Sequence, residues 1–180
     1  MILGKDIRLR AVESEDLPFF VRWLNDPEVI EFLDVYVPLS MLHEETWFEG
    51  LKKRPQEEHP LAIEINTPEG WRLIGNISFH HIETLDRCAE VGLFIGEKEY
   101  WNRGYGRKAL QLMLRHGFKT LNFNRIFLNV FASHLRGIRS YEKAGFIPEG
   151  SMRRFLNKEG CRYDMLFMGV LREEWLDNNS

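Results

Sequence analysis

The sequence has little cysteine and no long apolar run. Its only two cysteines, Cys88 and Cys161, are far apart and form no close ligand pair. Neither a disulfide framework nor a structural zinc site is therefore expected, and a reducing, cytoplasmic environment is the default. No apolar run approaches the ~18–20 residues that span a bilayer, and residues 1–6 lack the apolar stretch of a signal peptide. The sequence predicts no membrane partner.

Internal repeats and low-complexity stretches are also absent. Apolar residues make up 44% of the chain and charged residues 28%, which is ordinary globular usage and argues against intrinsic disorder. A length of 180 residues is close to the usual ~150 of one domain and long enough to bury a sizeable core. We therefore expect a single domain over residues 1–180.

The net charge of −3 conceals a strong asymmetry along the chain. Residues 1–100 carry 10 basic and 20 acidic side chains, whereas residues 101–150 carry 9 basic and 2 acidic ones. Such asymmetry indicates partners of opposite charge, although folding could simply mix these segments in space. The acidic first half argues against a nucleic-acid partner.

Hydrophobic periodicity predicts an alternation of strands and helices. Ser14 and Ser40 are expected to cap the first two helices, and Gly145 to end the last one. Three consecutive strands between residues 61 and 95 have short connections and predict an antiparallel meander. The whole order predicts an α+β fold, with a mixed sheet and helices on its faces. Strands are predicted at residues 6–12, 61–65, 71–82, 89–95, 125–131, from 146 onward and 163–171; helices at 14–24, 40–53, 106–121 and 135–144, with a loop or short helical piece at 28–38.

A glycine-containing loop precedes the third predicted helix. In the segment from Tyr100 to Lys108, Gly104 and Gly106 permit positive φ and close approach of a ligand. The unpaired N–H groups and the dipole of the helix that follows favour an anion there. Arg103, Arg107 and Lys108 add positive charge, so the segment predicts a pyrophosphate site rather than a solvated basic turn.

Two common phosphate motifs do not fit this loop. A P-loop would require Gly-x-x-x-x-Gly-Lys-Ser/Thr, which is absent. The dinucleotide fingerprint has a third glycine, and position 109 is alanine. That fingerprint also belongs to the first βα turn of a parallel repeat, whereas several strands precede this loop. A nicotinamide cofactor is therefore not expected.

Three segments resemble the GNAT superfamily of acetyl-CoA-dependent N-acetyltransferases. They are Ala89–Ile95, Tyr100–Gly106 and Ser140–Phe146, and the resemblance covers nearly the whole chain, from Ile7 to about Leu171. More narrowly, the sequence resembles ribosomal-protein N-terminal acetyltransferases and spermidine/spermine N-acetyltransferases. The resemblance implies the GNAT fold, a mixed and mostly antiparallel central sheet flanked by helices. It implies acetyl-CoA as co-substrate and no metal, and homodimers are common in the family.

The resemblance also implies which residues hold the cofactor. Backbone N–H groups of the glycine loop would bind the pyrophosphate, and Trp101 stands where most members have Gln or Arg. The backbone of the strand before the loop would pair with the pantetheine arm. His134 occupies the place of an Asn that usually contacts the CoA arm. The cofactor-binding residues implied in this way are Leu93, Phe94, Ile95, Asn102, Arg103, Gly104, Tyr105, Gly106, Arg107 and His134.

Two further residues are implied to be catalytic. The family's tyrosine, which usually protonates the departing thiolate, corresponds to Tyr141, and Glu90 lies where some members have a general base. The chemistry needs such groups, because an amine with pKa ~10 is protonated at neutral pH and cannot attack a thioester. From the residues alone, Glu90 could instead be a structural carboxylate, and Tyr141 a helix residue packed on the sheet. No covalent intermediate is implied, so Cys88 is expected to be inert.

The acceptor is expected to be a primary amine. Glu28, Glu31, Phe32 and Asp34 lie in the segment that lines the acceptor pocket in this family, where carboxylates would attract a cation. We favour a protein N-terminal α-amine, with a polyamine or another small amine as the alternative; a non-catalytic acyl-CoA sensor is an alternative of another class. His80 and His81 are adjacent strand residues, expected to face opposite sides and not to form a metal pair.

Overall fold

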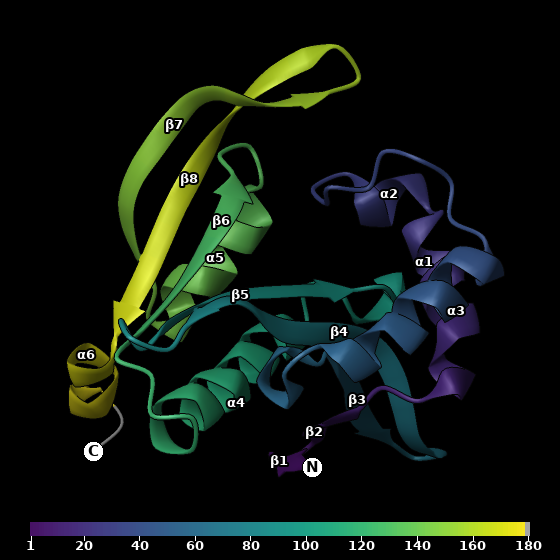
Figure 1. Cartoon of the computed structure of the whole chain (residues 1–180), viewed down its shortest axis with the longest axis horizontal. Coiled ribbons are helices and arrows are strands. Elements are labelled where there is room, and N and C mark those ends of the chain that lie inside the picture. Colours follow the sequence, from purple (N-terminus) through teal and green to yellow (C-terminus); the bar gives the residue numbers. More distant parts are fainter. Residues whose placement is uncertain (179–180) are drawn as a thin grey trace.

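A computed structural model describes residues 1–178 of the protein, which form one eight-stranded sheet (Figure 1). The strand order is β1-β2-β3-β4-β5-β6-β8-β7. All neighbours pair antiparallel except β5 and β6, which are parallel. The α+β fold class with its mixed, mostly antiparallel sheet is confirmed. The strands are β1 (Ile2–Leu3), β2 (Ile7–Ala11), β3 (Leu61–Thr67), β4 (Gly70–Glu83), β5 (Cys88–Ile95), β6 (Arg125–Phe131), β7 (Ile147–Lys158) and β8 (Cys161–Leu171).

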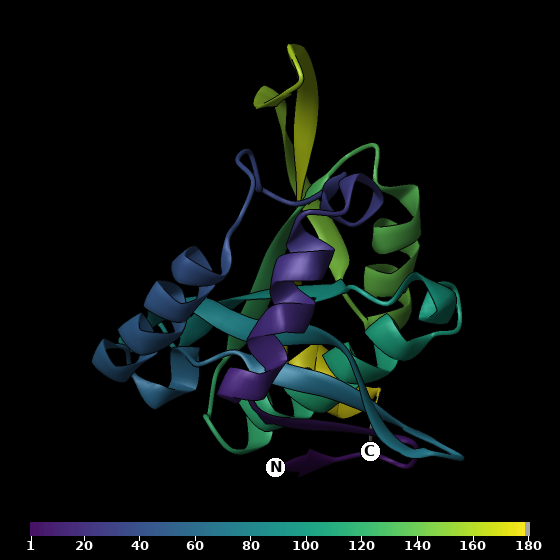
Figure 2. The same cartoon turned by 90° about the vertical axis from the view of Figure 1, so that its right-hand side faces the viewer.

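Helices lie on both sides of the sheet, with α3 on one side of the view in Figure 2 and α4 and α5 on the other. Of the helices, α6 was not predicted from the sequence, and neither was the two-residue strand β1. Within residues 1–178 no helix has the length and apolar character needed to cross a membrane. The helices are α1 (Leu17–Leu24), α2 (Pro27–Ile30), α3 (Met41–Gly50), α4 (Tyr105–Lys119), α5 (Leu135–Ala144) and α6 (Arg172–Asp177).

Helix ends explain where the predicted boundaries were right and wrong. Ser40 caps α3 as expected, since its hydroxyl accepts from the His43 N–H, and Gly145 ends α5 with φ of 106°. Ser14, by contrast, is not a cap. It begins a 3₁₀ turn, Ser14–Asp16, and α1 starts only at Leu17. The cap is Glu13 instead: the buried Asp16 carboxylate accepts from the Glu13 N–H in a capping box, and it also binds the Arg10 guanidinium.

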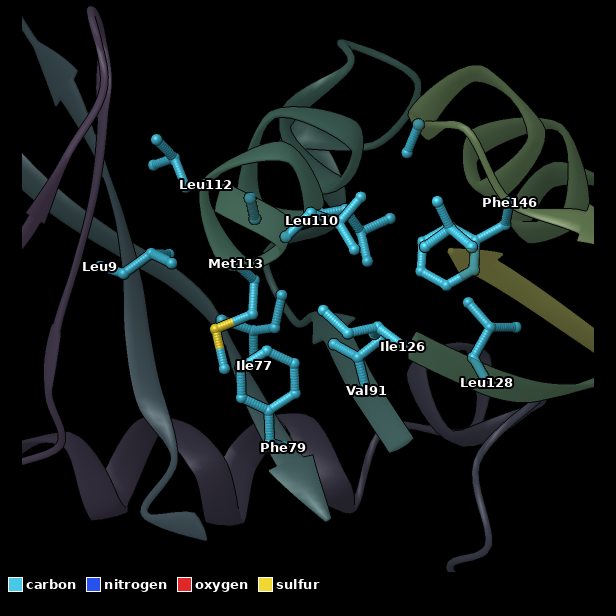
Figure 3. Packing of buried hydrophobic residues seen from close by; sticks show 14 of the residues in the cluster. Leu9, Ile77, Phe79, Val91, Leu110, Leu112, Met113, Ile126, Leu128 and Phe146 are labelled. Atoms are coloured by element: carbon cyan, nitrogen blue, oxygen red, sulfur yellow. The ribbon is translucent and has the colours of Figure 1, made fainter. Parts of the chain in front are cut away.

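Two apolar clusters hold the helices against the sheet. The larger joins α4 to the central strands, and Figure 3 shows Leu110 and Met113 of α4 pointing toward Ile77, Val91 and Ile126 on the strands. These side chains are almost entirely buried. The smaller cluster joins α1 and α3 to the opposite face of β3, β4 and β5. The sheet is therefore covered on both sides, and the strand ends near α4 are held rigidly.

The sheet opens between β5 and β6. The two strands pair only at Cys88–Glu90 with Arg125–Phe127, and beyond Glu90 they separate. In Figure 1, β5 continues across the molecule while β6 and β8 rise away from it. The second half of β5, Leu93 to Ile95, consequently has no strand beside it on the β6 side.

The long β7–β8 hairpin reaches back over the opening toward α2 (Figure 1). Lys158, at the end of β7, donates from Nζ to the carbonyl oxygens of Ile30 and Leu33, the latter at 3.0 Å. These carbonyls lie at and after the C-terminus of α2, where a cation is favourable. The hairpin thus touches the acidic segment of residues 27–34 that contains α2, here called the α2 segment. The two are more than 120 residues apart in sequence.

Candidate active site

A large cavity lies where β5 and β6 separate. Its volume is about 1130 Å³, at the upper end of the ~300–1,000 Å³ of ordinary ligand pockets, and leaves room for two substrates together. Every residue predicted for the site lines it except Glu31, which is exposed elsewhere on the α2 segment. The predicted residues brought together are Glu28, Phe32, Asp34, Glu90, Leu93, Phe94, Ile95, Asn102, Arg103, Gly104, Tyr105, Gly106, Arg107, His134 and Tyr141.

The glycine loop presents free N–H groups to this cavity. Gly104 precedes α4 with φ of 81°, and Asn102 also has positive φ, 61°. The first helical bond runs from the Lys108 N–H to the Gly104 carbonyl at 3.1 Å, so the earlier N–H groups of the helix have no helical partner. Arg107 Nε is buried and has no partner among residues 1–178. Unpaired donors of both kinds suit the oxygens of a pyrophosphate.

The positive charge around the loop differs from the sequence expectation at one residue. Lys108 does not line the cavity, because its ammonium pairs with Asp6 on the far side of α4. Cations from α5 line it instead, namely Arg136, Arg139 and Lys143. Sequence analysis did not single these out, although they contribute to the basic excess of residues 101–150.

Trp101 ties the loop to the end of β5. Its indole Nε1–H donates to the Ile95 carbonyl at 2.7 Å, and the Arg136 guanidinium lies 4.1 Å from its ring centroid. The indole thus links β5, the glycine loop and α5, which accounts for an aromatic residue at a position where Gln or Arg is usual in related sequences.

Tyr141 projects from α5 into the same cavity. Its ring packs edge-on against Phe146, with centroids 6.2 Å apart, and its hydroxyl has no hydrogen-bond partner among residues 1–178. Burial raises the pKa of Tyr141 to about 12. The hydroxyl is therefore protonated at neutral pH and available as a donor. The packing interpretation drawn from the sequence is confirmed, and the catalytic one stays a prediction.

Glu90 is held by two side chains. Its Oε1 accepts from Asn129 Nδ2 at 2.9 Å, and its Oε2 lies 2.8 Å from His81 Nδ1. The expectation that His80 and His81 face opposite sides of β4 is wrong, because both line the cavity. A bulge between His80 and Glu83 and a φ of 46° at His81 break the period-two alternation. Sequence reasoning missed His81 and Asn129, and no local signal identifies a bulge there.

Carboxylates and aromatic rings line the cavity near α2. Phe32 stacks on His134 with ring centroids 4.2 Å apart, so the α2 segment touches the start of α5. Burial, and secondarily Arg136, lower the pKa of His134 to about 4, which keeps this imidazole neutral. Glu28 lies 3.3 Å from the Lys98 ammonium, whereas Asp34 accepts from the Tyr36 hydroxyl. Glu58, from the segment before β3, is a further lining carboxylate that the sequence did not indicate.

The geometry agrees with comparisons to known proteins. The sequence profile of a family described as the acetyltransferase (GNAT) domain matches residues 6–147. An uncharacterised N-acetyltransferase of Bacillus licheniformis, p20, is 24% identical and covers 94% of each chain. The prophage-derived uncharacterised N-acetyltransferase YokL of Bacillus subtilis is 27% identical, covering 96% of this chain and 93% of its own.

A solved structure has the same fold. Spermidine N-acetyltransferase from Vibrio cholerae, in complex with CoA and spermine, superposes with a TM-score of 0.84 over 96% of this chain and 99% of its own, at 24% identity. The profile match extends over most of the chain, and the relatives align along nearly all of it. The chain therefore belongs to the GNAT family and is an N-acetyltransferase, of a family whose acetyl donor is acetyl-CoA.

Proposed function

We propose that the protein transfers the acetyl group of acetyl-CoA directly to the primary amine of a cationic acceptor, with both substrates bound together. The observation that carries this proposal is the single cavity of about 1130 Å³, in which the glycine loop and α5 supply cations and the α2 segment supplies carboxylates. An anionic donor and a cationic acceptor would each find a complementary wall there.

The donor would bind along the opening of the sheet. The N–H groups of residues 102–107 and the Arg107 guanidinium would hold the pyrophosphate. The backbone of Leu93, Phe94 and Ile95, which has no neighbouring strand toward β6, would pair with the amide groups of the pantetheine arm. His134, being neutral, would contact that arm as a hydrogen-bonding group rather than as a cation.

Tyr141 and Glu90 would serve the chemical step. The amine nitrogen attacks the thioester carbonyl, and the C–S bond breaks to release the CoA thiolate. One proton of the ammonium passes to a base at Glu90 before the attack. A proton on the Tyr141 hydroxyl can pass to the thiolate sulfur, and the second proton leaving the nitrogen restores the hydroxyl through water. Glu90 would lie where the amine gives up its proton, because its carboxylate is in the cavity and is hydrogen-bonded to two further polar groups.

A polyamine is the first acceptor to test. Four carboxylates line the cavity, those of Glu28, Asp34, Glu58 and Glu90, which suits an acceptor with more than one positive charge. The Vibrio cholerae spermidine N-acetyltransferase, whose structure is a complex with CoA and spermine, supports this choice. The sequence expectation of a protein N-terminal α-amine stays as the second candidate, because a peptide beginning with basic residues meets the same charge requirement.

An acceptor screen tests the proposal. Thiol release from acetyl-CoA is followed with spermidine, short basic peptides, acidic peptides and aminoglycosides. We expect release with spermidine or with basic peptides and none with acidic peptides. Binding of CoA without thiol release for any acceptor would support the alternative of a non-catalytic acyl-CoA sensor and contradict the proposal.

The Tyr141→Phe variant tests the role of the hydroxyl. It should lower kcat by about 100-fold, a typical contribution of one acid–base group, with little change in the affinity for CoA. Since the pKa of Tyr141 is about 12, wild-type kcat should show no loss from tyrosine ionisation up to about pH 10. A Tyr163→Phe variant is the matched control, because Tyr163 on β8 does not line the cavity. Wild-type turnover in Tyr141→Phe would remove the residue from the mechanism.

A further inference from the structure

His81 has an unusual backbone conformation on β4. Its φ of 46° is rare for a residue with a side chain, and it coincides with the interruption of the β4–β5 register between His80 and Glu83. Regular pairing would send the His81 side chain to the face opposite that of His80. The bulge instead directs His81 onto Glu90 of the neighbouring strand, in the wall of the cavity.

The hydrogen bonds around Glu90 leave it poorly placed to accept a proton directly. One carboxylate oxygen accepts from Asn129 Nδ2 at 2.9 Å, and the other accepts from His81 Nδ1 at 2.8 Å. The side chain of Glu90 is 19% exposed, whereas that of His81 is 78% exposed. A substrate amine approaching through the cavity therefore meets the imidazole more readily than the carboxylate.

The imidazole has a free nitrogen for this purpose. With the Nδ1 proton donated to Glu90, the neutral ring carries its lone pair on Nε2. Nε2 has no partner among residues 1–178, and His81 lines the cavity. Histidine is also the side chain that most readily exchanges a proton near neutral pH.

We propose that His81 takes the proton from the acceptor amine and that Glu90 is a positioning residue acting through it. This inference rests on the proposed function above. In this arrangement His81 is the base and the Glu90 carboxylate orients it, while Asn129 holds the second oxygen of that carboxylate in place.

The proton balance of the reaction closes with this assignment. An ammonium proton of the acceptor moves to His81 Nε2, and the Glu90 carboxylate stabilises the imidazolium that forms. The neutral amine makes the new N–C bond, the C–S bond breaks, and the sulfur receives the Tyr141 proton. A second proton leaves the nitrogen and reaches Tyr141 through water, and His81 releases its proton to solvent. The products are the acetamide, CoA thiol and one proton.

The charges around the imidazole are mixed. Glu90 on β5 faces it directly, and His80 precedes it on β4. Arg54 and Glu58, from the segment before β3, line the same wall and carry opposite charges. Among these groups, Glu90 is the one hydrogen-bonded to the His81 imidazole.

Steady-state kinetics of His81→Asn and Glu90→Gln, alone and combined, test the inference. Asparagine tolerates positive φ, so His81→Asn removes the base and keeps the backbone. With the acceptor found in the screen, we expect His81→Asn to lower kcat at least 100-fold, to leave CoA affinity within twofold, and to remove the acidic limb of the kcat/KM profile. His43→Asn is the matched control for a histidine substitution, because His43 is an exposed residue of α3 that does not line the cavity.

The Glu90 variants separate positioning from direct catalysis. Glu90→Gln should lower kcat about 10-fold, because the carboxylate that orients the imidazole is gone. The double variant should be no slower than His81→Asn. Wild-type kcat in His81→Asn, or a further loss in the double variant, would overturn the inference about His81 and leave the proposed function standing. A wild-type enzyme that acetylates no amine would overturn the proposed function as well.

Discussion

At the scale of single residues, left-handed backbone conformations occur in two parts of the candidate site, the glycine loop and the bulge on β4. Gly104 has φ of 81° beside the free N–H groups of α4, and His81 has φ of 46° beside Glu90. Positive φ costs glycine little free energy, whereas it strains a residue with a side chain, such as His81. The contacts of His81 with Glu90 and the surrounding sheet hold that conformation in place.

Gly104→Val should abolish measurable CoA binding in calorimetry. A side chain with positive φ costs about 1–2 kcal/mol and would displace the backbone N–H groups of the loop. Gly145→Val is a matched control, because Gly145 also has positive φ, also has open space where a Cβ would lie, and is outside the cavity. We expect the two variants to lose similar stability and only Gly104→Val to lose CoA binding. Unchanged CoA affinity in Gly104→Val would contradict the phosphate assignment.

The stability of the ligand-free protein should fall as the pH drops from about 6.5 to about 4. Burial lowers the pKa of His134 to about 4, so in this window the unfolded chain binds a proton that the folded chain does not. Stability therefore rises with pH across the window, and the contribution of His134 is on the order of 2–3 kcal/mol after allowance for partial exposure.

Denaturant unfolding at several pH values measures this contribution. His134→Gln should flatten the pH dependence relative to wild type, whereas His43→Gln, an exposed histidine on α3, should not. His80 and His116, whose pKa values burial also lowers, account for a slope of the same sign that persists in the variant. A slope unchanged by His134→Gln would contradict a buried neutral imidazole.

The residue scale also marks a limit of sequence-based prediction. Gly104 and Tyr141 belong to contiguous motifs, so their residue types and spacing were enough to propose roles. His81 and Asn129 come from strands about 48 positions apart and meet Glu90 only through a bulge and the pairing of β5 with β6. The cap predicted at Ser14 is wrong by one residue, because the capping box at the turn before α1 is formed by Glu13 and Asp16.

At the scale of elements, the parting of β5 and β6 creates the cavity. Only three residue pairs join the two strands, Cys88–Glu90 with Arg125–Phe127. The strands and long helices were predictable because hydrophobic periodicity is local. The antiparallel meander β3-β4-β5 was also predicted and is confirmed. The places of the other strands and the single parallel pairing were not predicted, because they depend on contacts distant in sequence. The short elements β1 and α6 have too few residues for a period to be detected.

Acetyl-CoA should slow amide hydrogen exchange along this opening. We expect at least a tenfold decrease for Leu93 and Ile95 and for residues 102–107, whose N–H groups would gain partners. The paired strand β3 is the internal reference, since its amides are already bonded to β2 and β4. Uniform slowing over the whole sheet would indicate global stabilisation only and would contradict this binding path.

At the scale of the whole molecule, the charge asymmetry of the sequence becomes an arrangement in space. The basic segment supplies the glycine loop and α5, and the acidic first half supplies the α2 segment, and both line one cavity. The sequence predicted the two signs and the cations Arg103 and Arg107, but not the cations of α5. Lys108 turns away to Asp6, whereas Arg136, Arg139 and Lys143 face the cavity.

Salt should weaken capture of the acceptor. With acetyl-CoA saturating, raising ionic strength from about 0.05 to 0.5 M should lower kcat/KM for spermidine by roughly tenfold or more, because screening reduces attraction to the carboxylates. Asp34→Asn should reduce this salt dependence, and Glu31→Gln, outside the cavity, should leave it closer to wild type. A salt-independent kcat/KM would contradict recognition by charge.

The position of Trp101 has a practical consequence. Its indole donates to the Ile95 carbonyl and lies under Arg136, at the edge of the proposed pyrophosphate site. Indole emission responds to nearby charge and to solvent, so a phosphate that draws Arg136 away would change the intrinsic fluorescence of the protein. We therefore expect Trp101 to act as an intrinsic optical reporter of donor binding, so that titrations would need neither a label nor turnover.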